Sequence, residues 1–170
     1  MKDTAEELFD VVDEHDNVIA CRPRSEVHRL GLRHRAVHIF LFRPDGCLLT
    51  HLRTADKEEF PGVWTSSASG HVASDEDYAS AAERELAEEL GIQASLKRVR
   101  KFAACPDTSH EFTVLYVAES NADVSPDPKE IADTRWLSPA EIHQWLTRAP
   151  QDFSPAFRLL FTAFHQPACD

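Results

Sequence analysis

Apolar and polar positions follow two periods along the chain, which separate predicted strands from predicted helices. Apolar runs at 34–43 and 47–54 flank the Pro-Asp-Gly turn at 44–46, so they predict a hairpin of two paired strands. Further strands are predicted at 8–20 (two short strands around a turn at 16–17), 96–105, 111–119 and in a short segment ending at 135–138.

The period changes to that of a helix after Gly70. Apolar residues recur there at helical spacing and form one narrow stripe of Ala79, Ala82, Leu86 and Leu90. Ser74 or Asp75 is placed to cap the start of this helix, and Gly91 stands where a terminal cap glycine is expected. The spacing predicts a helix of about three and a half turns.

Capping signals mark the other predicted helices, at 24–31, 138–148 and 154–165. Ser25 is the predicted N-cap of the first, and Gly31 its end. Ser138 and Glu141 form a predicted capping box for the second. The Pro/Gly/Ser-rich segment 60–70 is expected to be a connection.

Length and charge limit the classes of function. The 170 residues suffice for one domain with a full core, so a single domain over 1–170 is predicted. The net charge of −11 argues against nucleic-acid binding and against an anionic membrane surface, because phosphates are repelled unless cations are locally focused. An anionic substrate would therefore need a metal.

Cysteine placement and the N-terminal segment favour a reducing, cytoplasmic compartment. The four cysteines are far apart and form no C-x-x-C pair, so neither a zinc knuckle nor a redox motif is present. The segment 1–10 has no apolar core of a signal peptide, and no run of eighteen apolar residues occurs.

Carboxylates crowd one flank of the predicted helix. Glu85, Glu88 and Glu89 stand at i, i+3 and i+4, which brings their Cβ atoms roughly 5–6 Å apart. Arg84, solvent or a divalent cation would offset their repulsion, and carboxylate oxygens suit Mg²⁺ or Mn²⁺. Spacing alone does not separate a metal site from a solvated acidic face.

The wider pattern resembles the Nudix box in every fixed position. Gly70 is followed after five residues by Glu76, and seven residues later by the run Arg-Glu-Leu-Ala-Glu-Glu-Leu-Gly-Ile at 84–92. The resemblance identifies residues 70–92 as a Nudix box. It implies an α/β fold in which a mixed β-sheet is sandwiched between α-helices (α/β/α), with the box forming a loop, a helix and a loop.

The Nudix resemblance also implies roles for the box residues. The divalent-metal ligands would be the side chains of Glu85, Glu88 and Glu89 and the backbone carbonyl of Ser69. Arg84 would orient the glutamates by ion pairing, and Glu76 would hold Arg84.

The chemistry implied by the box is hydrolysis of a diphosphate. Mg²⁺ or Mn²⁺ would neutralise charge on the diphosphate oxygens and activate a water that attacks phosphorus. The substrate would be a small nucleoside-diphosphate-type or related molecule. Glu85 is the first candidate for the base that removes the proton, and Glu111 is the alternative.

Residues outside the box are similar to isopentenyl-diphosphate isomerase and its bacterial relatives. They are His34, the motif FPGVW at 60–64, the Gly-His pair at 70–71, Glu111 and the motif FSP at 153–155. This resemblance implies a second metal site at His34, His71 and Glu111, with His28 approximately in register. His38 shares a strand face with His34 and either supports it or fills the sheet.

One position of the isomerase pattern differs. The isomerase places a cysteine before the Gly-His pair, whereas this chain has Ser69, and a hydroxyl is a far weaker acid than a thiol, whose pKa is near 8.5. Hydrolysis is therefore favoured, with an isomerase-like protein and a non-catalytic Nudix binding module as alternatives. Arg53 and Lys57 are candidate phosphate ligands or an exposed charged loop. A homodimer is expected from its frequency in the superfamily.

Overall fold

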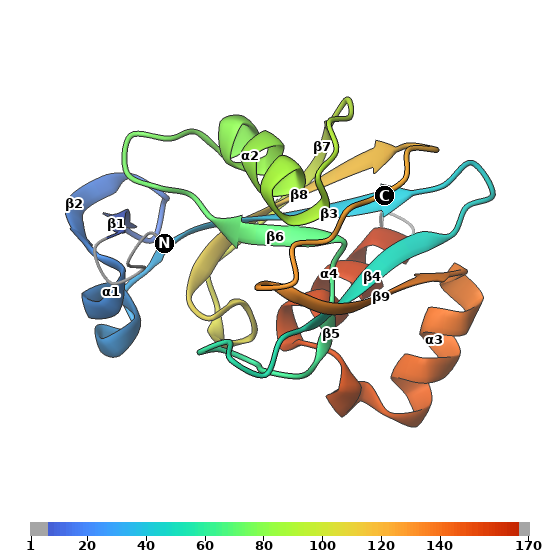
Figure 1. The fold of residues 1–170 in the computed structure, drawn as a ribbon. Helices are drawn as coiled ribbons and strands as arrows, with labels where there is room; N and C mark the ends of the chain where they lie inside the picture. The colour runs from blue at the N-terminus through green and yellow to red at the C-terminus, as the bar shows by residue number, and fades with distance from the viewer. Residues whose placement is uncertain (1–6, 167–170) are drawn as a thin grey trace.

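The computed structural model describes residues 7–166 (Figure 1). The strands are β1 Leu8–Val12, β2 Val18–Pro23, β3 His34–Phe42, β4 Leu48–Arg53, β5 Trp64–Thr65, β6 Ala68–His71, β7 Lys97–Phe102, β8 Glu111–Glu119 and β9 Ile131–Leu137. The helices are α1 Arg24–Leu30, α2 Tyr78–Leu90, α3 Pro139–Arg148 and α4 Pro155–His165, with short 3₁₀ turns at Pro106–Thr108 and Pro150–Asp152.

A seven-stranded mixed sheet organises the fold. The strand order is β5-β4-β3-β8-β7, with β6 pairing with β3 and β9 pairing with β4. The β3 and β8 strands are parallel, and the other pairs are antiparallel. Strands β1 and β2 form a separate two-stranded sheet. The predicted strands at 96–105 and 111–119 are confirmed as β7 and β8.

Helices cover both faces of the large sheet, as Figure 1 shows. Successive residues of β3 point to opposite faces. Val37, Ile39 and Leu41 therefore pack with the apolar side of α2, whereas Phe40 packs with α3 and α4. This arrangement confirms the predicted sandwich of a mixed sheet between helices.

The box helix begins later than its sequence predicted. Asp77 is the N-cap, and its Oδ1 accepts a hydrogen bond from Ser80 N at 2.8 Å, so the prediction of Ser74 or Asp75 is wrong. Ser74 instead donates its hydroxyl to Asp10, which ties the box loop to β1. Gly91 ends the helix with φ +67°, as predicted.

The buried side of the box helix also differs from the predicted stripe at one position. Ala79 is exposed, so its predicted place in the apolar stripe is wrong, and Ala81 is buried instead. The other three predicted members are buried: Ala82, Leu86 and Leu90.

Of the other capping predictions, one is wrong and two are confirmed. The prediction for Ser25 is wrong, because α1 already begins at Arg24, whose N donates to the carbonyl of Glu7 beside the end of β2. Gly31 ends this helix in the left-handed conformation, as predicted. The capping box of Ser138 and Glu141 is confirmed, with Glu141 N donating to Ser138 Oγ.

The predicted hairpin forms only at its turn. Strands β3 and β4 pair at Phe42 and Leu48 and then separate. Ser67 lies between them, since its Oγ donates to Leu49 O at 2.6 Å and accepts from Leu41 N at 2.8 Å. The segment predicted as a connection at 60–70 therefore contains β5 and β6, and β6 takes the edge of β3 that β4 leaves open.

Candidate active site

A cavity of about 1360 Å³ brings the predicted site residues together. Its wall includes β6, one flank of α2, the start of β8 and the loop between β4 and β5. The predicted residues that line it are Ser69, His71, Glu76, Arg84, Glu85, Glu88, Glu89, Glu111, Arg53 and Lys57.

Arg84 binds the carboxylates of the box. Its Nε and Nη2 donate to the two oxygens of Glu76 at 2.8 and 2.9 Å. Nη1 donates to Glu85 at 2.7 Å and to Glu88 at 3.4 Å, and Nη2 also donates to the carbonyl of His71 at 3.0 Å. This planar fork fixes the loop that precedes α2 against the helix.

Glu85 fits beside the backbone because residue 70 is glycine. A Cβ on Gly70 would lie 2.0 Å from Oε1 of Glu85, so any larger residue displaces this carboxylate. Glu89 lies further along the same flank, where its carboxylate accepts from Ser69 N at 3.2 Å. Burial raises the pKa of Glu85 to about 7 and that of Glu89 to about 8. A buried and a partly buried carboxylate on one flank of α2 suit a site for a cation.

A second cluster lies at the head of β3 and β8, where the parallel register places His34 next to Glu111. Nδ1 of His34 donates to the carbonyl of Leu32 at 2.8 Å, so Nε2 directs a lone pair toward Oε1 of Glu111 at 3.4 Å. Nε2 of His71 lies 3.0 Å from the same oxygen. Although burial opposes it, this pairing lowers the pKa of Glu111 and raises that of His34.

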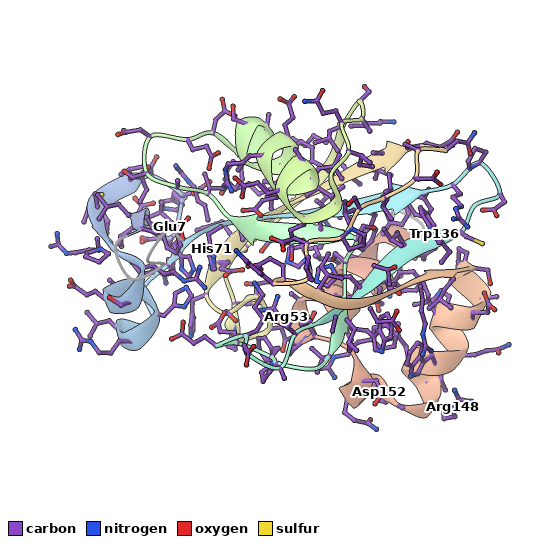
Figure 2. All side chains as sticks on the ribbon, viewed as in Figure 1. Glu7, Arg53, His71, Trp136, Arg148 and Asp152 are labelled. Atoms are coloured by element: carbon purple, nitrogen blue, oxygen red, sulfur yellow. The ribbon has the colours of Figure 1, made fainter. Side chains whose placement is uncertain are left out.

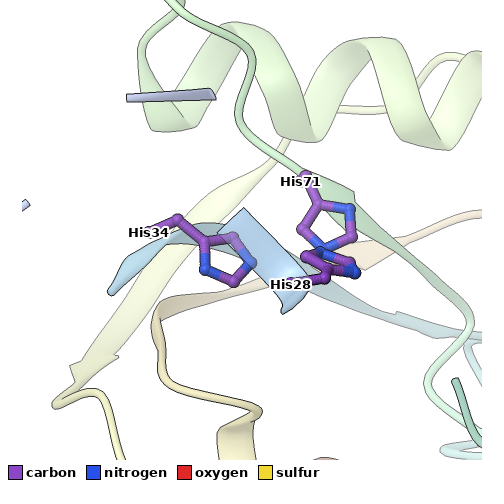
Figure 3. Close-up of side chains that lie close together, drawn as sticks. All are labelled: His28, His34 and His71. Carbon is purple, nitrogen blue, oxygen red and sulfur yellow. The ribbon is translucent and has the colours of Figure 1, made fainter. Parts of the chain in front are cut away.

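His28, a residue of α1, lies beside His34 and His71, as Figure 3 shows. Burial, and then the neighbouring His71 and His34, lower the pKa of His28 to about 4. Neither of its ring nitrogens has a hydrogen-bond partner among the described residues, nor has Nε2 of His34 or of His71. Phe9 stacks on the rings of His34 and His71 at 5.7 and 4.7 Å.

The unpaired nitrogens converge. In the described part of the chain, ligand atoms lie within 4.8 Å of one another in two groups, His28 with His34 and His71, and Glu59 with His71 and Glu111. Imidazole nitrogens and carboxylates are typical metal ligands, and in His34 the other ring nitrogen donates to a carbonyl, which is the usual way such a ligand is oriented. The donor set therefore fits a divalent cation.

The box glutamates do not form such a compact group. Arg84 holds Glu85 and Glu88, and 62% of the Glu88 side chain is exposed. Glu89 turns instead toward Ser69 N and the ring of His51, whose Nδ1 is 4.0 Å from it.

The two predicted phosphate ligands line the cavity but already have partners. Arg53 donates to the carbonyls of Glu59 and Phe60 at 2.8 to 3.1 Å, and Lys57 pairs with Glu130. Figure 2 shows Arg53 below β6, the strand that ends at His71. Both cations therefore add positive charge to a wall that carries many carboxylates and the further cations Arg24, Arg84 and Lys129.

Three residues of the site were missed or placed only roughly by sequence reasoning. His28 joins the cluster because Gly31 turns the chain back from α1 into β3, and this short helix followed by glycine was the available signal. Glu59 lies in an irregular loop, and His51 is buried in β4, so neither carries a periodic signal.

Comparisons with known proteins agree with this geometry. The family described as NUDIX domain matches residues 32–160. An isopentenyl-diphosphate Delta-isomerase of Serratia proteamaculans is 35% identical over 157 residues, covering 89% of this chain and 88% of the relative. A second one, from Nocardia farcinica, is 35% identical over 153 residues, covering 86% of this chain and 87% of the relative.

A solved structure of a Deinococcus radiodurans protein superposes with a TM-score of 0.84 at 27% identity. It covers 94% of this chain and all of its own. The likeness confirms the α/β Nudix fold expected from the box. Within residues 7–166, every helix is too short or too polar to cross a membrane.

Proposed function

The chain belongs to the Nudix family, in the branch similar to isopentenyl-diphosphate isomerases, and from this premise we propose that it is a metal-dependent pyrophosphohydrolase. The substrate would be a small nucleoside-diphosphate-type or related molecule, cleaved by attack of water on phosphorus. The observation that carries this proposal is the complete box, in which Arg84 joins Glu76 to Glu85 beside the buried Glu89.

The box residues would hold the catalytic cation. Glu85, Glu88, Glu89 and the carbonyl of Ser69 are the proposed ligands, and buried carboxylates with raised pKa values gain most from a bound cation. Mg²⁺ or Mn²⁺ bound there supplies charge neutralisation on the diphosphate and acidifies a bound water. Arg84 orients the glutamates through its pairing with Glu76.

The remaining polar side chains have proposed roles in proton transfer and phosphate binding. Glu85 is the proposed base. Glu111, the alternative base, pairs with His34 and His71, which favours a role in the second cluster. Arg53 and Lys57 lie on the cavity wall and would bind the diphosphate oxygens electrostatically.

The second cluster supports an isomerase-like protein as the alternative. His28, His34, His71 and Glu111 fit a metal, and the similar proteins of Serratia and Nocardia are named isopentenyl-diphosphate Delta-isomerase. Ser69 opposes this alternative, because its hydroxyl is too weak an acid to serve as the isomerase thiol does.

The test is product formation by the purified protein with Mg²⁺ or Mn²⁺ and with chelator. The panel holds nucleoside di- and triphosphates, dinucleoside polyphosphates, nucleotide sugars and isopentenyl diphosphate. We expect chelator-sensitive hydrolysis of at least one compound, seen as phosphate or phosphate-monoester products and abolished in Glu85→Gln. Allylic diphosphate from isopentenyl diphosphate would favour the isomerase, and binding of a compound without turnover would favour a non-catalytic module.

A further inference from the structure

One wall of the cavity is polar where an isoprenoid substrate would need apolar side chains. Among the described residues that line the cavity, the apolar side chains larger than glycine are Ala36, Phe60, Ala73 and Ala156. Phe60 is 39% exposed, and three alanines offer one methyl group each. The apolar surface that a branched five-carbon chain would meet there comes mainly from carbon atoms of polar residues, whereas binding sites for such groups are usually lined by large apolar residues.

His38 on β3 belongs to this polar wall. It alternates with Ala36 on the face that carries His34, and it is 6% exposed. Its Nδ1 is 2.7 Å from Oγ of Ser66, whereas Nε2 makes no hydrogen bond to any residue in the range 7–166. The ring lines the cavity, so either tautomer presents one hydrogen-bonding group to a bound molecule.

Ser66 and Ser69 place two hydroxyl groups beside this histidine, and Thr65 and Ser154 add two more to the lining of the same cavity. Ser69 lies opposite His38 in the β3–β6 pair, which places the two Cβ atoms roughly 4.5–5.5 Å apart on the same face. Thr65 Oγ1 and Ser154 Oγ are 2.9 Å apart, are both buried and both line the cavity. Ser154 is fixed as the N-cap of α4, where it accepts from Phe157 N.

A purely structural role accounts for only part of this wall. The pair of Thr65 and Ser154 is satisfied internally and joins β5 to α4. The ring of His38 is not satisfied in this way, because one nitrogen of a nearly buried imidazole is left without a protein partner. Nε2 of His38 is not among the described buried polar atoms that lack a partner, so it reaches the cavity surface, where water can solvate it. A bound ligand displaces that water, so a ligand that replaces its hydrogen bond gains affinity over one that does not.

We propose that the group attached to the diphosphate carries a hydroxyl, and that His38 is the specificity-determining residue that binds it through Nε2. This inference rests on the proposed hydrolase function and assigns the substrate class of the same cavity. A hydroxyl both donates and accepts, so it matches either tautomer of His38 as well as the hydroxyls of Ser69, Thr65 and Ser154. The class is that of diphosphates of hydroxylated, sugar-like or polyol-like groups.

The test compares isopentenyl diphosphate with saturated four- and five-carbon diphosphates that carry one hydroxyl at carbon 2, 3 or 4. Phosphate release gives kcat/KM with Mg²⁺. Calorimetry with the methylenebisphosphonate analogues gives Kd without turnover. We expect at least one hydroxylated compound to be preferred by about 10-fold or more in both measurements, because loss of a hydrogen bond leaves His38 unpaired.

Three variants separate recognition from folding. His38→Phe keeps an aromatic ring without the nitrogens. We expect this variant to bind and hydrolyse the hydroxylated compound less well and to treat isopentenyl diphosphate as the wild type does. His38→Gln keeps a hydrogen-bonding group and should retain part of the preference. His143→Phe is the matched control, since His143 is an exposed histidine of α3 outside the cavity lining. Thermal melting checks that each variant is folded.

The outcomes distinguish this inference from the proposed function. Equal or better use of isopentenyl diphosphate by the wild type would overturn the inference, as would an equal loss for all compounds in His38→Phe. Binding that prefers the hydroxylated analogues, without phosphate release from any compound, would support the inference and overturn the hydrolase function. Absence of binding by every analogue would overturn both.

Discussion

Nε2 of His34 faces Oε1 of Glu111 at 3.4 Å, while Nδ1 of the same ring donates to the carbonyl of Leu32. The donation to Leu32 leaves a lone pair on Nε2, so two electron-rich atoms face each other in a buried site. Only a proton or a metal cation between them makes this contact favourable. The relationship explains why the pKa of His34 is raised and that of Glu111 lowered, against the effect of burial.

Two distinct cation sites are predicted from this contact and from the box. We expect Mn²⁺ titration followed by electron paramagnetic resonance to show two classes of bound ion. Glu111→Gln should weaken the histidine class by at least about 10-fold, since it removes a ligand together with its charge. Glu89→Gln should weaken the other class. A single class, lost equally in both variants, would contradict this prediction.

Stability of the metal-free protein should depend on pH through Glu89. Burial raises its pKa from 4.5 to about 8, so between these values the folded state holds a proton that the unfolded state releases. Stability therefore falls as pH rises through this window. Urea unfolding in chelator should show this fall, and Glu89→Gln should reduce it. Part of the fall in stability with pH should remain in Glu89→Gln, because the pKa of Glu85 is also raised, to about 7. A slope that Glu89→Gln leaves unchanged would refute the assignment.

Gly70→Ala should disable the box without unfolding the protein. The added Cβ would lie 2.0 Å from Oε1 of Glu85, and that atom is the end of a flexible side chain that can move. We expect near-normal thermal melting together with at least about 10²-fold lower activity, the typical cost of losing one charge-stabilising group. Gly46→Ala is the control for activity: no atom lies within 4 Å of the added Cβ, and its φ of +85° makes a loss of stability with unchanged activity the expected result.

Ser69→Cys should not create an isomerase. The new thiol would stand opposite His38 in a cavity with few apolar side chains to hold an isopentenyl group. We expect no allylic product by gas chromatography of the dephosphorylated products. Allylic product that also requires Glu111 would show that the isomerase site is intact.

Local signals predicted the elements that local interactions determine. Gly91 ends α2, and the capping box of Ser138 and Glu141 begins α3. Both act through hydrogen bonds within a few residues, so the sequence alone located them. Asp77 was missed because Ser74 and Asp75 offer the same chemistry two or three residues earlier. Tertiary contact decided between them, since Ser74 binds Asp10 of β1.

Contacts between distant segments were beyond sequence patterns. The side-chain hydroxyl of Ser67 bridges backbone atoms of β3 and β4 through two hydrogen bonds, so a polar segment became part of the buried sheet. In the site, family resemblance supplied His34, His71 and Glu111, and the structure brings them together. Glu59 joins them from an irregular loop whose position depends on the whole fold.

The most direct test of the central claim is hydrolysis in ¹⁸O-labelled water with Mg²⁺, using the best substrate of the panel. Mass spectrometry of the products locates the new oxygen. Attack of water on phosphorus predicts ¹⁸O in a phosphate product only, at a rate abolished by chelator and by Glu85→Gln. Label in the alcohol product, or turnover to an isomer without any label, would contradict the hydrolase function.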